Sequence, residues 1–219
     1  MEHGAFDPKS FSGIVPVFPL PNVVLFPGMF LPLHIFEPRY RQMTADALAG
    51  ERLLAMALLK PGWKEDYEGS PPIHDIVGVG KIIEDTKLPD GRYNLVLLGL
   101  TRVRIVEELG KGMYRTARVE ILEDREPGGH DAERKRRILL GLYEQIMTQL
   151  AGKVAKPPED VPLGMLCDLV ASMIALDPAT RQSLLGELDV ALRCGRLLEF
   201  VQAPSEVRKR TWPMGPSLN

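Results

Sequence analysis

With 219 residues, of which 45% are hydrophobic and 26% charged, the chain has enough apolar side chains for one large or two small domains without disulfides. Its formal net charge of -2 excludes a general attraction to nucleic acid or acidic lipid, so any such binding needs a local basic patch. The chain has only two cysteines, no secretory leader after its polar start and no apolar run of the roughly 20 residues that span a membrane, which favours a reduced cytoplasmic protein.

The N-terminal part of the chain contains apolar runs that prolines interrupt. Residues 14–18 form such a run around Pro16, and we predict an edge strand there because proline cannot donate to a sheet ladder. Residues 23–26 are β-branched, aliphatic and aromatic, and the turn residues Pro27 and Gly28 follow them. We therefore predict a second short strand at residues 23–26.

A third strand and a helix are predicted next. Residues 30–35 alternate between two faces, and Pro32 places this strand at a sheet edge or at a bulge. A proline at the first helical position and apolar residues at helical spacing predict a helix over residues 38–49. Glu37 and Arg39 flank that proline, and a salt bridge or a contact at the helix start explains them better than catalysis does.

Short strands and tight turns continue towards residue 125. The tripeptide Pro-Asp-Gly at residues 89–91 predicts the turn of an antiparallel hairpin, and Gly78 and Gly80 indicate a bulge or a close backbone approach within its first strand. The remaining strands are predicted at residues 53–59, 73–83, 93–98, 102–106 and 114–122. So many short strands favour a β barrel or pseudo-barrel over a parallel sheet.

The composition changes at residues 126–130, beyond which the apolar period becomes helical. Helices are predicted at residues 131–150 and 163–174, from the capping pair Asp177–Pro178, and from about Asp189. The sequence thus predicts an α+β protein. Its expected parts are a mostly β domain at residues 1–125 with one helix at 38–49, a helical bundle at 131–203 and a flexible tail at 204–219.

Three segments, in order, resemble one known family. The stretch PLPNVVLFPGMFLPLHIFEPRY, residues 19–40, is similar to the opening motif of the N-terminal substrate-binding domain of Lon proteases, in the FEPRY form of its stand-alone bacterial members. A second segment resembles the family's hairpin, which has the pattern LPDG…GxxR: KIIEDTKLPDGRYNLVLLGLTRVRIVE. The segment LGMLCDLVASMIALDPATRQSLLGELDVALRCGRLLEFV resembles the family's C-terminal helices.

The resemblance covers nearly the whole chain. It implies that the β part is a pseudo-barrel related to PUA domains and that a helical bundle follows it. It also implies a stand-alone adaptor or recognition protein, which binds unfolded polypeptide or a protein partner and catalyses nothing.

A full Lon protease also carries an ATPase module and a Ser/Lys peptidase module, and the sequence shows a motif for neither. GVGK at residues 78–81 lacks the GxxxxGK[ST] spacing of a phosphate loop, and the four histidines lack the i, i+4 spacing of a helical metal site. Cys167 and Cys194 lie on apolar stripes, where cysteine is usually a core residue. We therefore predict no catalytic residue, no metal site and no cofactor.

The predicted recognition site combines an edge strand with a loop. Trp63 and Tyr67 lie in the polar segment WKEDYEGSPP, and such aromatic anchors are enriched where proteins meet partners. The alternative, that Trp63 folds back over the barrel, carries equal weight. Phe30 and His34 lie on the polar-facing side of the edge strand, where unpaired backbone groups can accept an extended peptide.

A run of four basic residues gives an alternative binding face: Arg134, Lys135, Arg136 and Arg137. The run lies near a predicted helix start, where the macrodipole disfavours cations, so a solvated face paired with Asp131 and Glu133 or a partner contact is expected. A PUA-like RNA-binding module and a structural oligomerisation module remain the rival functions. Nucleic acid is the less favoured partner, because no aromatics interleave with the basic residues; a homo-oligomer is compatible with the sequence.

Overall fold

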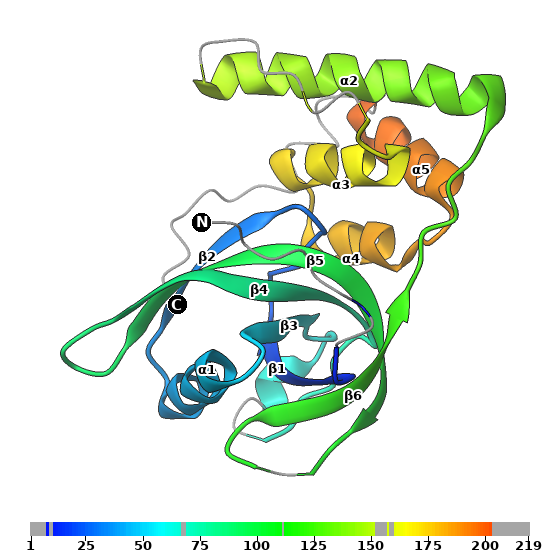
Figure 1. Cartoon of the computed structure of the whole chain (residues 1–219). Helices are drawn as coiled ribbons and strands as arrows, with labels where there is room; N and C mark the ends of the chain where they lie inside the picture. The colour runs from blue at the N-terminus through cyan, green and yellow to red at the C-terminus, as the bar shows by residue number, and fades with distance from the viewer. Residues whose placement is uncertain are drawn as a thin grey trace. The chain divides into compact units, whose positions relative to one another are not determined.

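The computed structural model describes residues 8, 11–66, 69–110, 112–151, 157 and 160–202. Within these residues the protein is of the α+β class, with six strands in one sheet and five α-helices (Figure 1). The chain divides into two compact units between Leu122 and Glu123. The first unit holds the six strands and one helix, and the second holds the other four helices. The predicted tail at residues 204–219 lies outside the described residues.

The six strands are hydrogen-bonded in the order β2-β5-β4-β3-β1-β6, and β5 also pairs with β6. Five strands therefore form a closed ring of ladders, and β2 is attached outside the ring. The ring can close because β5 is 16 residues long: its first half pairs with β2 and its second half with β6. The strands are β1 Ile14–Leu20, β2 Phe30–Ile35, β3 Leu53–Leu58, β4 Ile76–Lys87, β5 Tyr93–Glu108 and β6 Arg115–Leu122.

The edge position predicted for the first strand is wrong, because β1 pairs with β3 on one side and β6 on the other. The two ladders overlap only at Val17: residues 14–17 pair with β6, and residues 17–20 with β3. Pro16 and Pro19 each therefore have a partner strand on one side only. Proline is tolerated at both positions because each is locally an edge.

The strand predicted at residues 23–26 is also wrong, because the segment pairs with no strand that the structure describes. Leu25 and Phe26 are nevertheless fully buried. A Cβ atom on Gly78 would lie 2.0 Å from the Leu25 carbonyl oxygen, and one on Gly99 would lie 2.1 Å from the Phe26 carbonyl oxygen. The segment thus packs its backbone directly on glycines of β4 and β5, which is the close approach expected at Gly78.

The two strands predicted at residues 93–98 and 102–106 are one continuous strand, β5. Gly99 lies at the predicted break, but its N–H donates to the Met29 carbonyl and its carbonyl accepts from the Gly28 N–H, both at 2.8 Å. The loop before β2 crosses β5 at Gly99, where a glycine allows a close approach. β5 continues through this residue.

Other local predictions are confirmed. β2 has the predicted bounds and, within the described part of the chain, pairs only with β5, so Pro32 does lie on an edge strand. The helix α1 spans Pro38–Ala49 with its proline in the first turn. The β4–β5 hairpin turns at Gly91, whose φ of 84° is a conformation that glycine adopts at no steric cost.

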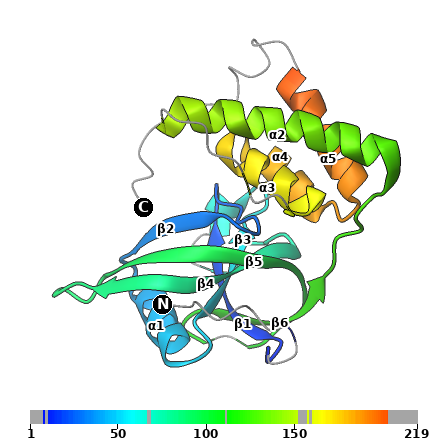
Figure 2. The same cartoon turned by 45° about the horizontal axis from the view of Figure 1, so that its top comes forward.

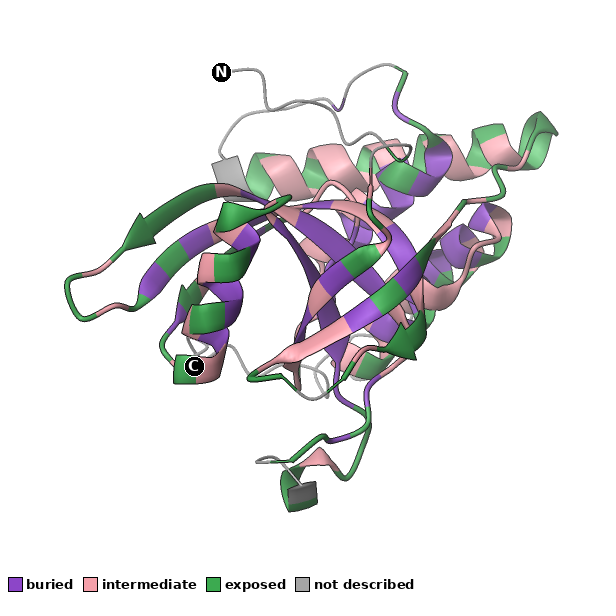
Figure 3. Cartoon of the chain, turned by 60° about the horizontal axis from the view of Figure 1, so that its bottom comes forward, coloured by how far each residue is buried: buried purple, intermediate pink, exposed green. Residues whose placement is uncertain are grey.

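The first unit buries two apolar clusters on the two faces of β3. Leu54 and Met56 join a cluster to which β2 and α1 also contribute. Ala55 and Ala57 point the other way, into a cluster that draws on all five strands of the ring and on neither β2 nor α1. Figure 3 shows this burial as purple along the strands of the ring. All six residues of β3 are buried, as its uninterrupted apolar sequence predicts.

The helices of the second unit follow the predicted periodicity. They are α2 Gly129–Ala151, α3 Leu163–Met173, α4 Pro178–Gly186 and α5 Val190–Gln202. α2, α3 and α5 contact one another, and α4 contacts α5 (Figure 2). Asp177 caps α4 as predicted, because its carboxylate accepts from the Thr180 N–H at 2.9 Å. The apolar stripe of α2 is only partly covered: Leu139 is buried, whereas Ile138 is 38% exposed.

A buried charge network joins the start of the second unit to its helices. The Arg193 side chain on α5 is fully buried and donates to both carboxylate oxygens of Asp124 and to the Glu187 carbonyl. Its Nε lies 3.5 Å from Asp168 on α3, which is 1% exposed. Cys167 and Cys194, predicted to be core residues, are both fully buried beside this network.

Candidate functional site

The outer side of β2 exposes apolar side chains in alternation. Phe30, Pro32 and His34 of β2 and Phe36 just after it are exposed, whereas Leu31 and Ile35 between them are buried and Leu33 is half-buried. Phe30 is 62% exposed and Phe36 is 42% exposed. A strand with one face in solvent normally carries polar residues on that face, so an exposed Phe-Pro-His-Phe series on an edge strand is typical of a binding surface.

His34 is held in place within this β2 surface by residues of β5 and the turn before it. Its Nδ1 lies 2.6 Å from the Asn94 Oδ1, and Arg92 Nη1 donates to its Nε2 at 3.3 Å. Its ring stacks on Phe36 at 6.3 Å between centroids. The predicted site residue His34 therefore lies against Phe36, an aromatic residue that is not among the predicted site residues.

Trp63 lies in a different part of the first unit. It begins a short 3-10 helix, Trp63–Asp66, and its half-buried ring packs against the cluster inside the strand ring. β2 contributes nothing to that cluster. Tyr67 lies outside the described residues, so the structure does not place it.

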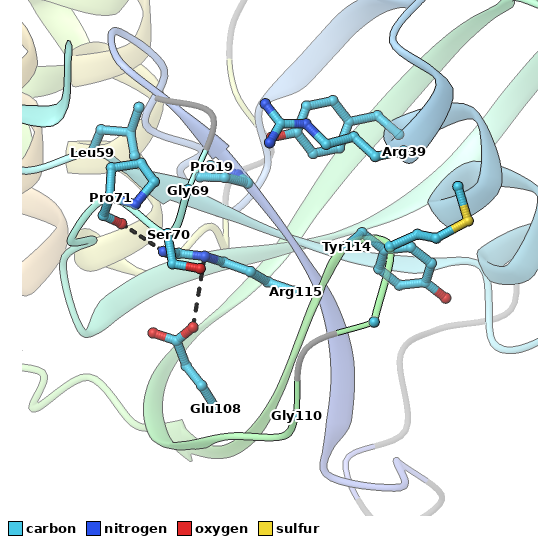
Figure 4. Close-up of a pocket in the computed structure, with 13 residues that line it drawn as sticks. Pro19, Arg39, Leu59, Gly69, Ser70, Pro71, Glu108, Gly110, Tyr114 and Arg115 are labelled. Atoms are coloured by element: carbon cyan, nitrogen blue, oxygen red, sulfur yellow. Dashed lines mark hydrogen bonds and ion pairs between the residues drawn. The ribbon is translucent and has the colours of Figure 1, made fainter. Parts of the chain in front are cut away.

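A pocket of about 780 Å³ opens in the first unit between four segments that are distant in sequence (Figure 4). The segments are the end of β1, the start of α1, the chain after β3 and the connection from β5 to β6. Residues that line it include Pro19, Arg39, Tyr40, Leu59, Pro71, Glu108, Met113, Tyr114 and Arg115. The pocket therefore has prolines, aromatics and aliphatic side chains on its walls and two guanidinium groups among them.

Ion pairs hold both arginines of the pocket. Arg39 Nε is 3.0 Å from the Glu37 carboxylate, which confirms the predicted salt bridge, and its guanidinium lies 4.6 Å over the Tyr40 ring. Arg115 donates to the Pro71 carbonyl at 2.7 Å and lies 3.7 Å from Glu108, as the dashed lines in Figure 4 show. These contacts fix both cations before any ligand arrives.

Tyr114 connects the pocket to α1. Its hydroxyl donates to the Asp46 carboxylate at 2.7 Å. Burial, together with this hydrogen bond, raises the pKa of Tyr114 to about 12, so the hydroxyl keeps its proton at neutral pH and the bond persists.

The four basic residues at the start of α2 do not form one basic surface. Arg134 and Lys135 both pair with Asp131, as expected, at 3.1 and 2.6 Å. Arg136 donates to the Val161 carbonyl, and only Arg134 and Arg137 are exposed. Two separate exposed arginines give no support to the RNA-binding alternative.

The sequence alone does not reveal the pocket, because its walls come from four distant segments. The FEPRY motif contains Arg39 and Tyr40, but nothing near them in sequence indicates that Arg115 lies across from them. Among the described residues, no group of three or more His, Cys, Asp or Glu side chains is placed to hold a metal ion. No helix within the described part of the chain is both long and apolar enough to cross a membrane.

Comparison with known proteins gives one consistent family. The family model described as the ATP-dependent protease La (LON) substrate-binding domain matches residues 14–203. A Lon protease of Roseiflexus castenholzii is 28% identical over 214 residues, covering 92% of this chain and 25% of that protein. Lon protease 2 of Herpetosiphon aurantiacus is 31% identical over 189 residues, covering 84% of this chain and 23% of that protein. The chain thus spans about a quarter of the length of these curated relatives.

Two solved structures share the fold. A Lon N-terminal domain protein from Xanthomonas campestris matches with a TM-score of 0.65 at 23% identity, covering 87% of this chain and 99% of that chain. The N-terminal domain of the Mycobacterium avium complex Lon protease matches with a TM-score of 0.62 at 19% identity, covering 85% and 97%.

Proposed function

Because the chain belongs to the family of the ATP-dependent protease La (LON) substrate-binding domain, we propose that it recognises polypeptide substrates and contributes binding without chemistry of its own. In this role it acts as an adaptor or a recognition module. The same family membership supports a PUA-like pseudo-barrel for the ring of five strands and a helical bundle for α2 to α5.

The observation that carries the proposal is the β2 surface, formed by Phe30, Pro32, His34 and Phe36. Among the described strands β2 pairs only with β5, so its other edge can receive an extended peptide by strand addition. Main-chain hydrogen bonds would then give affinity for any unfolded segment, and the two exposed phenylalanines would favour segments with apolar side chains. Such loose specificity suits a protein that recognises unfolded chains.

Trp63 and Tyr67 remain candidate contacts of the same function. Trp63 is half buried, so it has ring surface left for a partner while it covers the strand ring. We test it separately, because its removal changes the core as well as the surface.

Fluorescence anisotropy with a permanently unfolded polypeptide, such as reduced and carboxymethylated α-lactalbumin, measures this binding. Phe30→Ser should weaken it by about 2 kcal/mol, roughly thirtyfold in Kd, because an aromatic anchor is lost. The matched control is Val106→Ser on the second half of β5, where a side chain that is 58% exposed lies beyond the β2 ladder. The control should bind like the wild type.

Equal binding by Phe30→Ser and the wild type would show that the β2 surface is not the recognition site. Trp63→Ala distinguishes the two roles of that residue: weaker binding at an unchanged melting temperature makes it a contact, whereas a lower melting temperature with intact binding makes it a core residue. Light scattering on the free protein tests the rival role of β2, which is pairing with a second copy to form a homo-oligomer.

A further inference from the structure

We propose that the pocket between α1 and the β5–β6 connection binds a carboxylate group of a polypeptide, with the neighbouring apolar side chain against the pocket wall. This inference rests on the proposed function for the nature of the ligand, but it concerns a different site from the β2 surface. It would give the protein a preference among the segments of an unfolded chain.

Arg115 is a largely buried cation in the pocket wall. Its side chain is only 13% exposed, so its charge is largely removed from water. One hydrogen bond, to the Pro71 carbonyl, uses a single donor, and the nearest carboxylate, that of Glu108, is 3.7 Å away. Among the described residues Arg115 Nη1 is buried and has no hydrogen-bond partner. A buried cation that is incompletely satisfied gains from a further anion nearby, and because Nη1 itself is closed to solvent the attraction acts on the charge of the whole guanidinium.

Arg39, at the start of α1, is the second cation in the pocket wall. Its guanidinium is fixed by Glu37 and by the Tyr40 ring, so it loses little freedom when a ligand binds. Guanidinium groups bind carboxylates through charge-assisted and often bidentate hydrogen bonds. Of the residues that line the pocket, two are cationic and one, Glu108, is anionic, and Glu37, which pairs with Arg39, is not among the lining residues.

The walls indicate what accompanies the carboxylate. Pro19, Leu59 and Pro71 are apolar, and Met113 is 64% exposed among the pocket residues. A volume of about 780 Å³ lies within the range of roughly 300–1,000 Å³ that holds a small ligand, so a few residues of an extended chain fit and a folded domain does not. The favoured ligand is therefore an apolar residue that carries or adjoins a carboxylate.

Two sources can supply this chemistry: the C-terminus of a chain, or an aspartate or glutamate side chain. Three short fluorescein-labelled peptides of otherwise equal sequence distinguish them by anisotropy with the full chain. One ends in leucine with a free carboxylate, one ends in leucine amide, and one ends in leucine amide with a glutamate before it. We expect the free acid, the glutamate peptide or both to bind about tenfold more tightly than the plain amide.

Arg39→Gln should remove this preference, whereas Arg41→Gln, on the same helix but outside the pocket lining, should keep it. The preference of the wild type should also shrink as salt is added, which tests the charge independently of any variant's folding. Equal binding of all three peptides, absence of peptide binding, or a preference that survives Arg39→Gln would overturn the proposal. Binding of unfolded protein through Phe30 is measured separately, so either site can fail alone.

Discussion

Replacing Arg193 by methionine should destabilise the second unit by about 3 to 5 kcal/mol, the cost of breaking a buried ion pair from one side. Methionine retains most of the apolar stem, so the change removes mainly charge and hydrogen bonds. The side chain is fully buried and bonds Asp124 and the Glu187 carbonyl, while its Nε lies 3.5 Å from Asp168. Asp124 is 22% exposed and can turn to water, but Asp168 is 1% exposed and would stay buried without its cation.

Urea unfolding followed by circular dichroism at the helical band measures this loss. Arg196→Gln is the matched control, because Arg196 lies on the same helix and pairs with Glu187 at 3.0 Å but is 50% exposed. An exposed pair contributes about 0 to 1 kcal/mol. The double variant Arg193→Met with Asp168→Leu should recover much of the loss, since the buried carboxylate is then removed together with the cation that lies beside it. If Arg193→Met costs no more than the control, Arg193 does not hold these segments together.

Three further substitutions test how close backbone approach and helix capping stabilise the fold. Gly78→Ala should cost about 3 kcal/mol or more in urea unfolding, because its Cβ would lie 2.0 Å from the Leu25 carbonyl oxygen and a backbone atom cannot turn aside. Gly141→Ala, a helical position with nothing within 4 Å, should stabilise slightly instead. Asp177→Ala should lower stability by about 1 kcal/mol at neutral pH through loss of the α4 cap. Burial alone would raise the pKa of the Asp177 carboxyl, but the hydrogen bonds that it accepts from Thr180 outweigh burial and hold that pKa below its usual value. The cap therefore stabilises fully above pH 4 or so, and the difference in thermal midpoint between wild type and variant should vanish as the pH falls through the lowered pKa.

Local chemistry predicted the elements whose cause lies within a few residues. The alternation around Pro32, the proline that starts α1, the Pro-Asp-Gly turn and the Asp177 cap all appear where the sequence places them. Each depends on a fixed φ, a missing donor or a side chain that bonds a nearby N–H. The predicted role of Phe30 and His34 used the same local argument, and it stays a prediction.

Two wrong predictions share one cause, because each inferred strand pairing from the residue types of a short segment. Pro16 has no partner strand on one side of β1, but it pairs with β6 on the other, because the two ladders of β1 are offset along the strand. The apolar run at residues 23–26 is buried as a loop on glycines rather than as a strand. An apolar pattern shows that a segment is buried, but not which neighbour buries it.

By itself, the sequence determined the local features with a cause inside a few residues, such as the start of α1, the turn at Gly91 and the cap of α4, and membership of the family of the LON substrate-binding domain. Only the tertiary structure decided which residues meet. Closure of the strand ring brings Arg115 into the same pocket as Arg39, and packing of α5 brings Arg193 to Asp124, 69 residues earlier in the chain. The physical reason is that these meetings depend on strand register and helix packing over long separations, where residue order imposes no distance, whereas caps and turns bond within a few residues.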